Sequence, residues 1–142
     1  MNRRLILWLL AAVASFCAEP RSNFSGTWKL NEAASGTAAT APREIVWKIE
    51  HNDPRFKYSL TGKRGYMPFS EAYDFTTDGK MPSDPAKVGV CAAWEGEALV
   101  LRYVKDGREF ARFTLHLSAD GKQMTREGAM GNVNLREVYD RQ

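Results

Sequence analysis

The sequence predicts an all-β protein whose strands form an antiparallel, up-and-down meander of about eight or nine strands closed into a barrel. Short runs in which apolar and polar residues alternate recur along the chain, as in half-buried strands whose successive side chains point to opposite faces. Asp-Gly pairs separate several runs, and type I′ hairpin turns favour this pair because both central residues need positive φ. Closure removes the exposed edges of the meander. A sandwich of two sheets is the alternative.

The first 17 residues have the features of a secretory signal peptide. Two arginines precede an apolar run from Leu5 to Phe16, which is typical of such signals and shorter than the roughly 20 residues that span a bilayer. Cleavage after Cys17 leaves residues 18–142 as a single β-barrel domain, and cleavage after Ala14 is the alternative. Lipid attachment at Cys17 is a third hypothesis, which the bulk of Phe16 disfavours. We therefore expect a secreted or periplasmic protein with no membrane span.

Charge and cysteine content narrow the function classes. The chain has 20 Lys and Arg against 17 Asp and Glu. Without the two signal arginines 18 of those 20 remain, so the net charge is near +1 and no basic footprint for nucleic acid is left. Cys91 lies within an apolar strand pattern, which predicts a small buried residue. Cleavage after Ala14 would also allow a Cys17–Cys91 disulfide in an oxidising compartment.

The first three strands are separated by one long loop and one turn. The first strand begins at the Gly-Thr-Trp of residues 26–28, and residues 31–43, rich in Ala, Ser, Thr and Gly, form the loop that follows. Residues 45–50 and 55–60 show the alternation of strands. The turn Asn52-Asp53-Pro54 joins them, because Pro cannot donate to a strand ladder and Asn and Asp favour turns.

The remaining strands follow a second loop. Residues 61–68 contain two glycines and are expected to form this loop, ahead of a strand at residues 71–76. Asp78-Gly79 begins a wide connection that contains two prolines. Short turns then separate the last strands, which suits neighbouring antiparallel pairs. These last strands cover residues 88–94, 99–103, 113–117, 123–130 and 133–139.

Aromatic side chains gather on the apolar faces of these strands. An eight-stranded barrel has an interior that side chains can fill or that can hold one small ligand. Ligand pockets are mainly apolar with a few polar groups, which tyrosine hydroxyls and indole nitrogens can supply. Plain core packing is the alternative explanation. The candidate ligand-binding residues are Trp47, Tyr58, Tyr73, Phe75, Trp94 and Tyr103.

No catalytic or metal-binding constellation is visible in the sequence. His51 borders the Asn-Asp-Pro turn and is expected to be a solvated loop residue, and His116 points away from its two leucine neighbours. A metal site needs three or four ligands, and neither a nucleophile motif nor a phosphate-binding loop is present. We therefore expect neither enzymatic activity nor a cofactor.

Several short motifs resemble those of one family. The block Phe24-Ser25-Gly26-Thr27-Trp28-Lys29-Leu30 opens the chain, Trp94-Glu95-Gly96 and the Leu-Ser-Ala-Asp-Gly-Lys of residues 117–122 form later turns, and Val138-Tyr139-Asp140-Arg141 ends it. Together they resemble small bacterial extracytoplasmic lipocalin-like proteins of the calycin superfamily. The resemblance implies that Trp28 closes one end of a barrel, that Gly26 lets the chain enter the first strand tightly, and that Arg141 or Arg136 packs over the indole, a cation–π contact worth about 0.5–2 kcal/mol.

One departure from the related fatty-acid-binding proteins concerns the ligand. Those proteins hold a carboxylate with an Arg-x-Tyr pair on the last strand. Here Arg136 and Tyr139 are three residues apart, so they face opposite sides of a regular strand, and Glu137 shares the face of Tyr139. The resemblance therefore does not carry this carboxylate clamp to the present chain.

The sequence thus predicts a monomeric binding protein that holds a small apolar or amphipathic ligand inside its barrel. The alternative is a barrel with a filled core that acts through its surface as an inhibitor, adhesion or envelope component. An interior pocket of about 300 Å³ or more would favour ligand binding.

Overall fold

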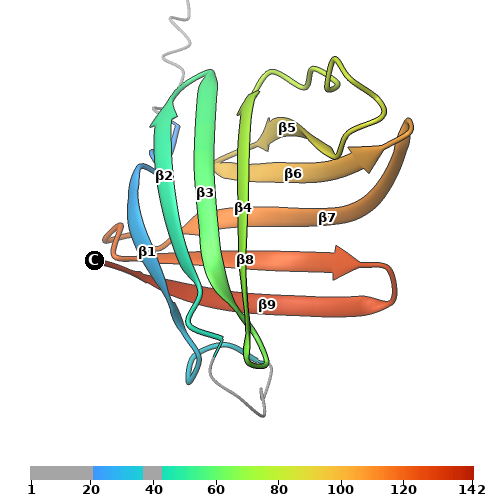
Figure 1. Ribbon diagram of the computed structural model, residues 1–142. Coiled ribbons are helices and arrows are strands. Elements are labelled where there is room, and N and C mark those ends of the chain that lie inside the picture. Colours follow the sequence, from blue (N-terminus) through green and yellow to red (C-terminus); the bar gives the residue numbers. More distant parts are fainter. Residues whose placement is uncertain (1–20, 37–42) are drawn as a thin grey trace, which may run out of the picture.

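The computed structural model describes residues 21–36 and 43–142 (Figure 1). The predicted signal segment, Cys17 and most of the loop expected at residues 31–43 therefore lie outside the described residues. The described part of the chain consists of β-strands joined by turns and loops. The strands are β1 (Gly26–Asn31), β2 (Val46–Asn52), β3 (Arg55–Arg64), β4 (Met67–Thr76), β5 (Gly89–Glu95), β6 (Ala98–Lys105), β7 (Arg108–Leu117), β8 (Gln123–Met130) and β9 (Val133–Arg141).

All nine strands belong to one antiparallel sheet in the order β4-β3-β2-β1-β9-β8-β7-β6-β5. Strands that follow one another in sequence are neighbours except β4 and β5, and β1 also pairs with β9, which joins the two ends of the meander. The sheet curls so that β1–β4 cross over β5–β9 (Figure 1). Between β4 and β5 the ladder is open, apart from an isolated bridge between Asp78 and Ala93. The predicted all-β meander is confirmed, as a nearly closed barrel.

Turn chemistry positions the hairpins as the sequence indicates. Asp106 and Gly107, between β6 and β7, have φ of 52° and 72°, the two positive values that a type I′ turn requires. Gly128 on β8 is required for a steric reason, because a Cβ at this position would lie 1.9 Å from the Arg112 carbonyl oxygen on β7. The curl of the sheet thus brings β7 and β8 too close for any side chain at this position.

Two predicted boundaries are wrong. The loop expected at residues 61–68 does not form, because β3 continues to Arg64 and β4 starts at Met67. Pro68 is tolerated there because β4 is an edge strand, and Gly62 is needed because a Cβ would lie 2.9 Å from an Ile45 side-chain atom. The strand expected at residues 88–94 begins instead at Gly89, so Val88 precedes it and is exposed.

The core fills the barrel from the end where β1 begins. Phe24, Trp28, Trp47, Phe56 and Leu99 have no exposed surface, and they belong to one continuous cluster of buried side chains. Cys91, as its strand pattern predicted, is also fully buried. It accepts a hydrogen bond at 2.9 Å from the Arg102 guanidinium. Partly exposed apolar side chains border this cluster, namely Phe69, Tyr73, Phe75, Trp94, Leu117 and Leu135.

Within residues 21–36 and 43–142, the structure has no helix that is long and apolar enough to cross a membrane.

Candidate functional site

Trp28 and Arg141 close one end of the barrel. The Trp28 ring is fully buried and its indole N–H donates to the Phe24 carbonyl at 2.9 Å. The Arg141 guanidinium lies 4.2 Å from the ring centroid and donates to the Ser25 and Gly121 carbonyls at 2.6 and 2.9 Å. A Cβ on Gly26, whose φ is +139°, would meet this guanidinium at 2.6 Å. Arg141, on β9, therefore joins the start of β1 to the turn between β7 and β8.

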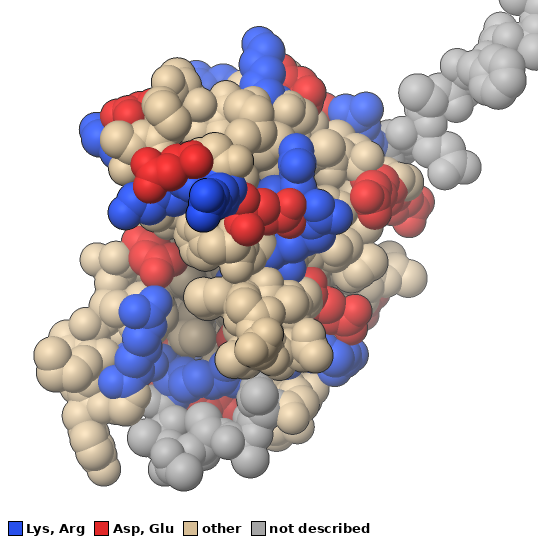
Figure 2. Space-filling view, turned by 90° about the vertical axis from the view of Figure 1, so that its right-hand side faces the viewer, with Lys and Arg blue, Asp and Glu red and all other residues tan. Residues whose placement is uncertain are grey.

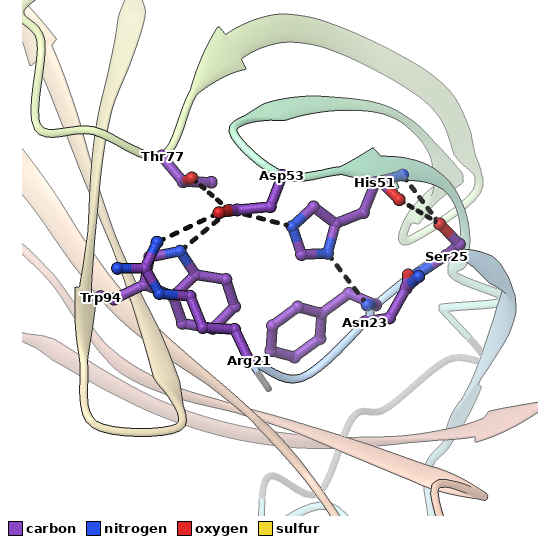
Figure 3. Close-up of polar contacts among 8 residues, drawn as sticks. Arg21, Asn23, Ser25, His51, Asp53, Thr77 and Trp94 are labelled. Carbon is purple, nitrogen blue, oxygen red and sulfur yellow. Dashed lines mark hydrogen bonds and ion pairs between the residues drawn. The ribbon is translucent and has the colours of Figure 1, made fainter. Parts of the chain in front are cut away.

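A polar network completes the same end (Figure 3). Asp53, in the β2–β3 turn, accepts hydrogen bonds from the Thr77 hydroxyl at 2.6 Å and the Trp94 indole at 3.0 Å, and pairs with Arg21 at 3.1 Å. His51 reaches the same carboxylate at 3.4 Å. The carboxyl therefore ties the β2–β3 turn to the segment after β4, to β5 and to the N-terminal segment. Although burial alone raises its pKa, these donors together lower the pKa of Asp53 to about 2.

The prediction that His51 is a solvated loop residue is wrong. It lies on β2, is only 7% exposed, and packs among Phe24, Phe56 and Trp94. Its Nδ1 accepts the Phe24 backbone N–H at 3.2 Å, so the ring carries its proton on Nε2 and donates it toward Asp53. The strand β2 continues to Asn52, so the ladder includes His51 and the first residue of the predicted turn.

This network does not form a nucleophile site. The Ser25 hydroxyl donates to the backbone carbonyl of His51 at 2.9 Å and accepts its backbone N–H at 2.8 Å. The imidazole is thus not hydrogen-bonded to the hydroxyl that it would have to activate. The network instead holds together the segments at this end of the barrel. We call its members the clasp: Arg21, His51, Asp53, Thr77 and Trp94.

The other candidate aromatic residues form a connected cluster inside the barrel. Trp47 packs on Tyr58 with ring centroids 4.5 Å apart, and Tyr73 lies between Tyr58 and Tyr103. The Tyr58 and Tyr103 hydroxyls are 2.6 Å apart. Burial raises the pKa of both phenols, so both stay protonated and one donates to the other. Phe75 stacks on Phe56 and joins this group to the closed end.

Beside this cluster lie three charged groups, which we call the arginine cluster: Arg43 and Arg126, which are half-buried, and Glu137, which is buried. The Glu137 side chain, on β9, is 2% exposed. One carboxylate oxygen accepts from Arg43 at 2.9 Å and the other from Arg126 on β8 at 2.6 Å. The Arg126 guanidinium also lies 3.6 Å from the Phe113 ring centroid and 5.6 Å from that of Trp47. The cluster is therefore continuous with the aromatic interior.

The arginine cluster holds more donors than acceptors. Within the described part of the chain, the buried Arg43 Nε and Nη2 and Arg126 Nε have no hydrogen-bond partner. Buried polar groups are nearly always paired. All three atoms are pure N–H donors, so each lacks an acceptor.

A cleft of about 550 Å³ lies between β4 and the segment after it, at the gap between β4 and β5. The inward-facing Tyr73 and Phe75 line it together with Pro82 and Val90. Figure 2 views the molecule from the side of the β6–β7 and β8–β9 turns, and Lys and Arg side chains flank a hollow in the lower half of that face.

The structure separates the sequence-predicted candidates into two groups. Trp47, Tyr58, Tyr73, Phe75 and Tyr103 line the interior, whereas Trp94 belongs to the clasp at the closed end. Sequence reasoning missed Arg43 and Arg126. The signal for Arg126 was a charged residue two positions after Met124, on the inward-facing side of a strand. In the ranges that the structure describes, no three His, Cys, Asp or Glu side chains gather in a way that could hold a metal ion.

Solved structures with this architecture are similar over nearly their whole length. Human cRBP IV is 14% identical, with a TM-score of 0.62 over 85% of this chain and 99% of that one. The fluorescent protein UnaG is 20% identical, with a TM-score of 0.55 over 84% and 97%. The REP1-NXSQ fatty acid transporter is 13% identical, with a TM-score of 0.54 over 83% and 95%. No protein-family model and no curated protein sequence matches the chain. The likeness to these solved structures shows the fold of the chain, a nearly closed antiparallel β-barrel.

Proposed function

We propose that this protein binds one small amphipathic molecule inside its barrel. The apolar body of the ligand lies against the aromatic cluster, and a head group that accepts hydrogen bonds lies at the arginine cluster. The observation that carries this proposal is the set of buried, unpaired N–H donors on Arg43 and Arg126. The likeness of the fold to a fatty acid transporter supports it.

The energetics favour a ligand of this kind. Each buried donor without a partner costs about 1–3 kcal/mol, and a carboxylate or carbonyl oxygen placed among the donors recovers that cost. Burial of an alkyl or aromatic body adds about 25 cal/mol per Å² before the cost of association is subtracted.

The barrel is suited to binding at its open half. The closed end is filled by side chains, but Tyr73 and Phe75 remain partly exposed at a cleft of about 550 Å³. Leu135 and Phe69 are also partly exposed. An apolar body can therefore enter past β4 without disturbing Trp28 or the clasp around Asp53.

Calorimetric titration with dodecanoate tests this function. We expect one dodecanoate per chain, and Arg126→Gln is expected to weaken binding at least about tenfold, the equivalent of one lost charge-assisted hydrogen bond. Arg136→Gln is the matched control, because Arg136 lies nearby on the same hairpin but is exposed and pairs with Glu127. Emission of Trp47 should change on binding, because its ring lies 5.6 Å from the Arg126 guanidinium.

A second measurement covers the case in which Arg126→Gln does not fold. Native mass spectrometry of the wild-type protein, purified from its own host, should show a bound small molecule. Folded wild-type protein that carries no such molecule and binds neither dodecanoate nor dodecanol would contradict the proposal, and would favour action through the surface.

We also propose that the mature protein is secreted or periplasmic. The basic start and apolar run of residues 1–17 support this location. Expression of the full chain in a bacterium, followed by fractionation and N-terminal sequencing, tests it. The expected product begins at residue 18 and leaves the cytoplasm, and an uncleaved cytoplasmic product would contradict the proposal.

A further inference from the structure

We infer that residues 21–24 are a pH-sensitive latch, which holds the closed end of the barrel while the His51 ring is neutral and detaches when the ring takes up a proton. The inference concerns a buried titratable side chain that the proposed ligand site does not use. It is independent of the proposed ligand, because it rests on the clasp alone (Figure 3).

The imidazole holds this segment through an acceptor that exists only on the neutral ring. Nδ1 of His51 accepts the Phe24 backbone N–H at 3.2 Å, while Nε2 lies 3.4 Å from the Asp53 carboxylate. A protonated imidazole has a donor on both nitrogens and no acceptor. Protonation therefore turns the bond to Phe24 into a contact between two donors, and turning the ring over does not restore an acceptor. The Phe24 amide then has to move away and bond to water.

The charges around the ring weaken the latch further. Arg21, whose side chain is 54% exposed, pairs with the Asp53 carboxylate at 3.1 Å. A positive ring beside that carboxylate keeps its own contact with Asp53 and repels the Arg21 guanidinium. Phe56 on β3 and Trp94 on β5 also pack on the ring but carry no charge. The other titratable side chains nearby lie exposed on the outer face of β2, β3 and β4, namely Glu50, Arg55, Lys57 and Asp74.

Release of the latch uncovers the closed end. Phe24 is fully buried and its ring stacks on Trp94 with centroids 6.0 Å apart. Its carbonyl accepts the Trp28 indole N–H, so the residue that closes the barrel loses a hydrogen bond as well. Ser25 stays in place, because its hydroxyl bonds to the backbone N–H and carbonyl of His51, which do not titrate. Ser25 is therefore the hinge.

The pH range of the latch follows from the chemistry of imidazole, the side chain that ordinarily changes charge between about pH 5 and 8. Although burial alone raises the pKa of Asp53, its hydrogen-bond donors lower that pKa to about 2, so the carboxylate stays charged over this range. The second histidine of the chain, His116, is exposed on β7. The latch is thus closed at the upper end of the range and opens as the pH falls.

Hydrogen exchange of the Phe24 amide, measured by NMR at pH 7.5 and pH 5.0, tests the latch. Each rate is expressed as a protection factor relative to an unstructured chain at the same pH, which removes the intrinsic pH dependence of exchange. In the wild type we expect the protection of Phe24 to fall at least about tenfold at pH 5.0, the equivalent of about one lost hydrogen bond. The Leu101 amide on β6, which pairs with both β5 and β7, should keep its protection.

His51→Asn separates protonation from packing. The Asn side-chain oxygen can accept the Phe24 N–H in place of Nδ1 but does not titrate, so the protection of Phe24 should be equal at the two pH values. His116→Asn is the matched control and should behave as the wild type does.

If His51→Asn does not fold, an NMR titration of the wild-type His51 ring tests the same point, because ring protonation and loss of Phe24 protection should share one midpoint. Three outcomes would overturn the inference. They are unchanged protection of Phe24 in the wild type, an equal fall in His51→Asn, and a fall that Leu101 shares.

Discussion

Replacing Trp28 by alanine should destabilise the protein strongly, because Trp28 is the centre of the closed end. The ring is fully buried and makes a hydrogen bond to Phe24 at 2.9 Å and a cation–π contact with Arg141 at 4.2 Å. Loss of a large buried aromatic side chain costs about 3–5 kcal/mol. Within that total, the hydrogen bond accounts for about 1 kcal/mol and the cation–π contact for about 0.5–1 kcal/mol.

Urea unfolding followed by circular dichroism measures this loss. Trp28→Phe separates the components, since it keeps most of the buried ring and removes the indole N–H, and we expect it to cost about 1–2 kcal/mol. Phe110→Ala is the surface control, because this aromatic side chain is 43% exposed. A Trp28→Ala variant that loses less than about 1 kcal/mol would refute the assignment of Trp28 as the residue that closes the barrel.

Two further changes test the clasp and the strand packing. Because the pKa of Asp53 lies at about 2, below its ordinary 3.8, its contribution to stability is complete above about pH 4 and is lost as the pH falls toward 2. Because the Asp53 side chain is about one-third exposed, we expect its contribution to the free energy of unfolding to be about 1 kcal/mol. The urea midpoint of Asp53→Asn should therefore fall less than that of the wild type between pH 5 and pH 2.5. An equal fall in both proteins would contradict this prediction. Gly128→Ala should destabilise by about 1–3 kcal/mol, because the added Cβ would meet the Arg112 carbonyl at 1.9 Å; a wild-type melting temperature would show that β7 and β8 are not so close.

The sequence predicted the order and faces of the strands because these depend on local patterns. Alternation placed Trp47, Tyr58 and Phe113 on inward faces, and Asp106-Gly107 gave a turn with two positive φ values. The wrong strand boundary arose because glycine and proline occur both in loops and at special positions within strands. Gly62 and Pro68 suggest a loop at residues 61–68, whereas in the structure close packing requires the glycine and the edge position of β4 tolerates the proline.

The candidate site was only half visible in the sequence. Aromatic residues at alternate positions signalled an interior cluster, and Glu137 was seen to share a face with Tyr139. The partners of Glu137 were missed because Arg43 is 94 residues away along the chain. His51 was misassigned for a similar reason, since the contacts that bury it come from Phe24 and from Trp94 on β5.

The sequence by itself determined that this chain is an antiparallel meander with an apolar interior, since strand periodicity and turn preferences act over a few residues. Only the tertiary structure decided that β1 joins β9, that the wall stays open between β4 and β5, and that two arginines share one glutamate inside. Those features depend on the curl of the sheet, which brings distant strands together and makes burial, and hence the need for paired charges, a property of the whole barrel.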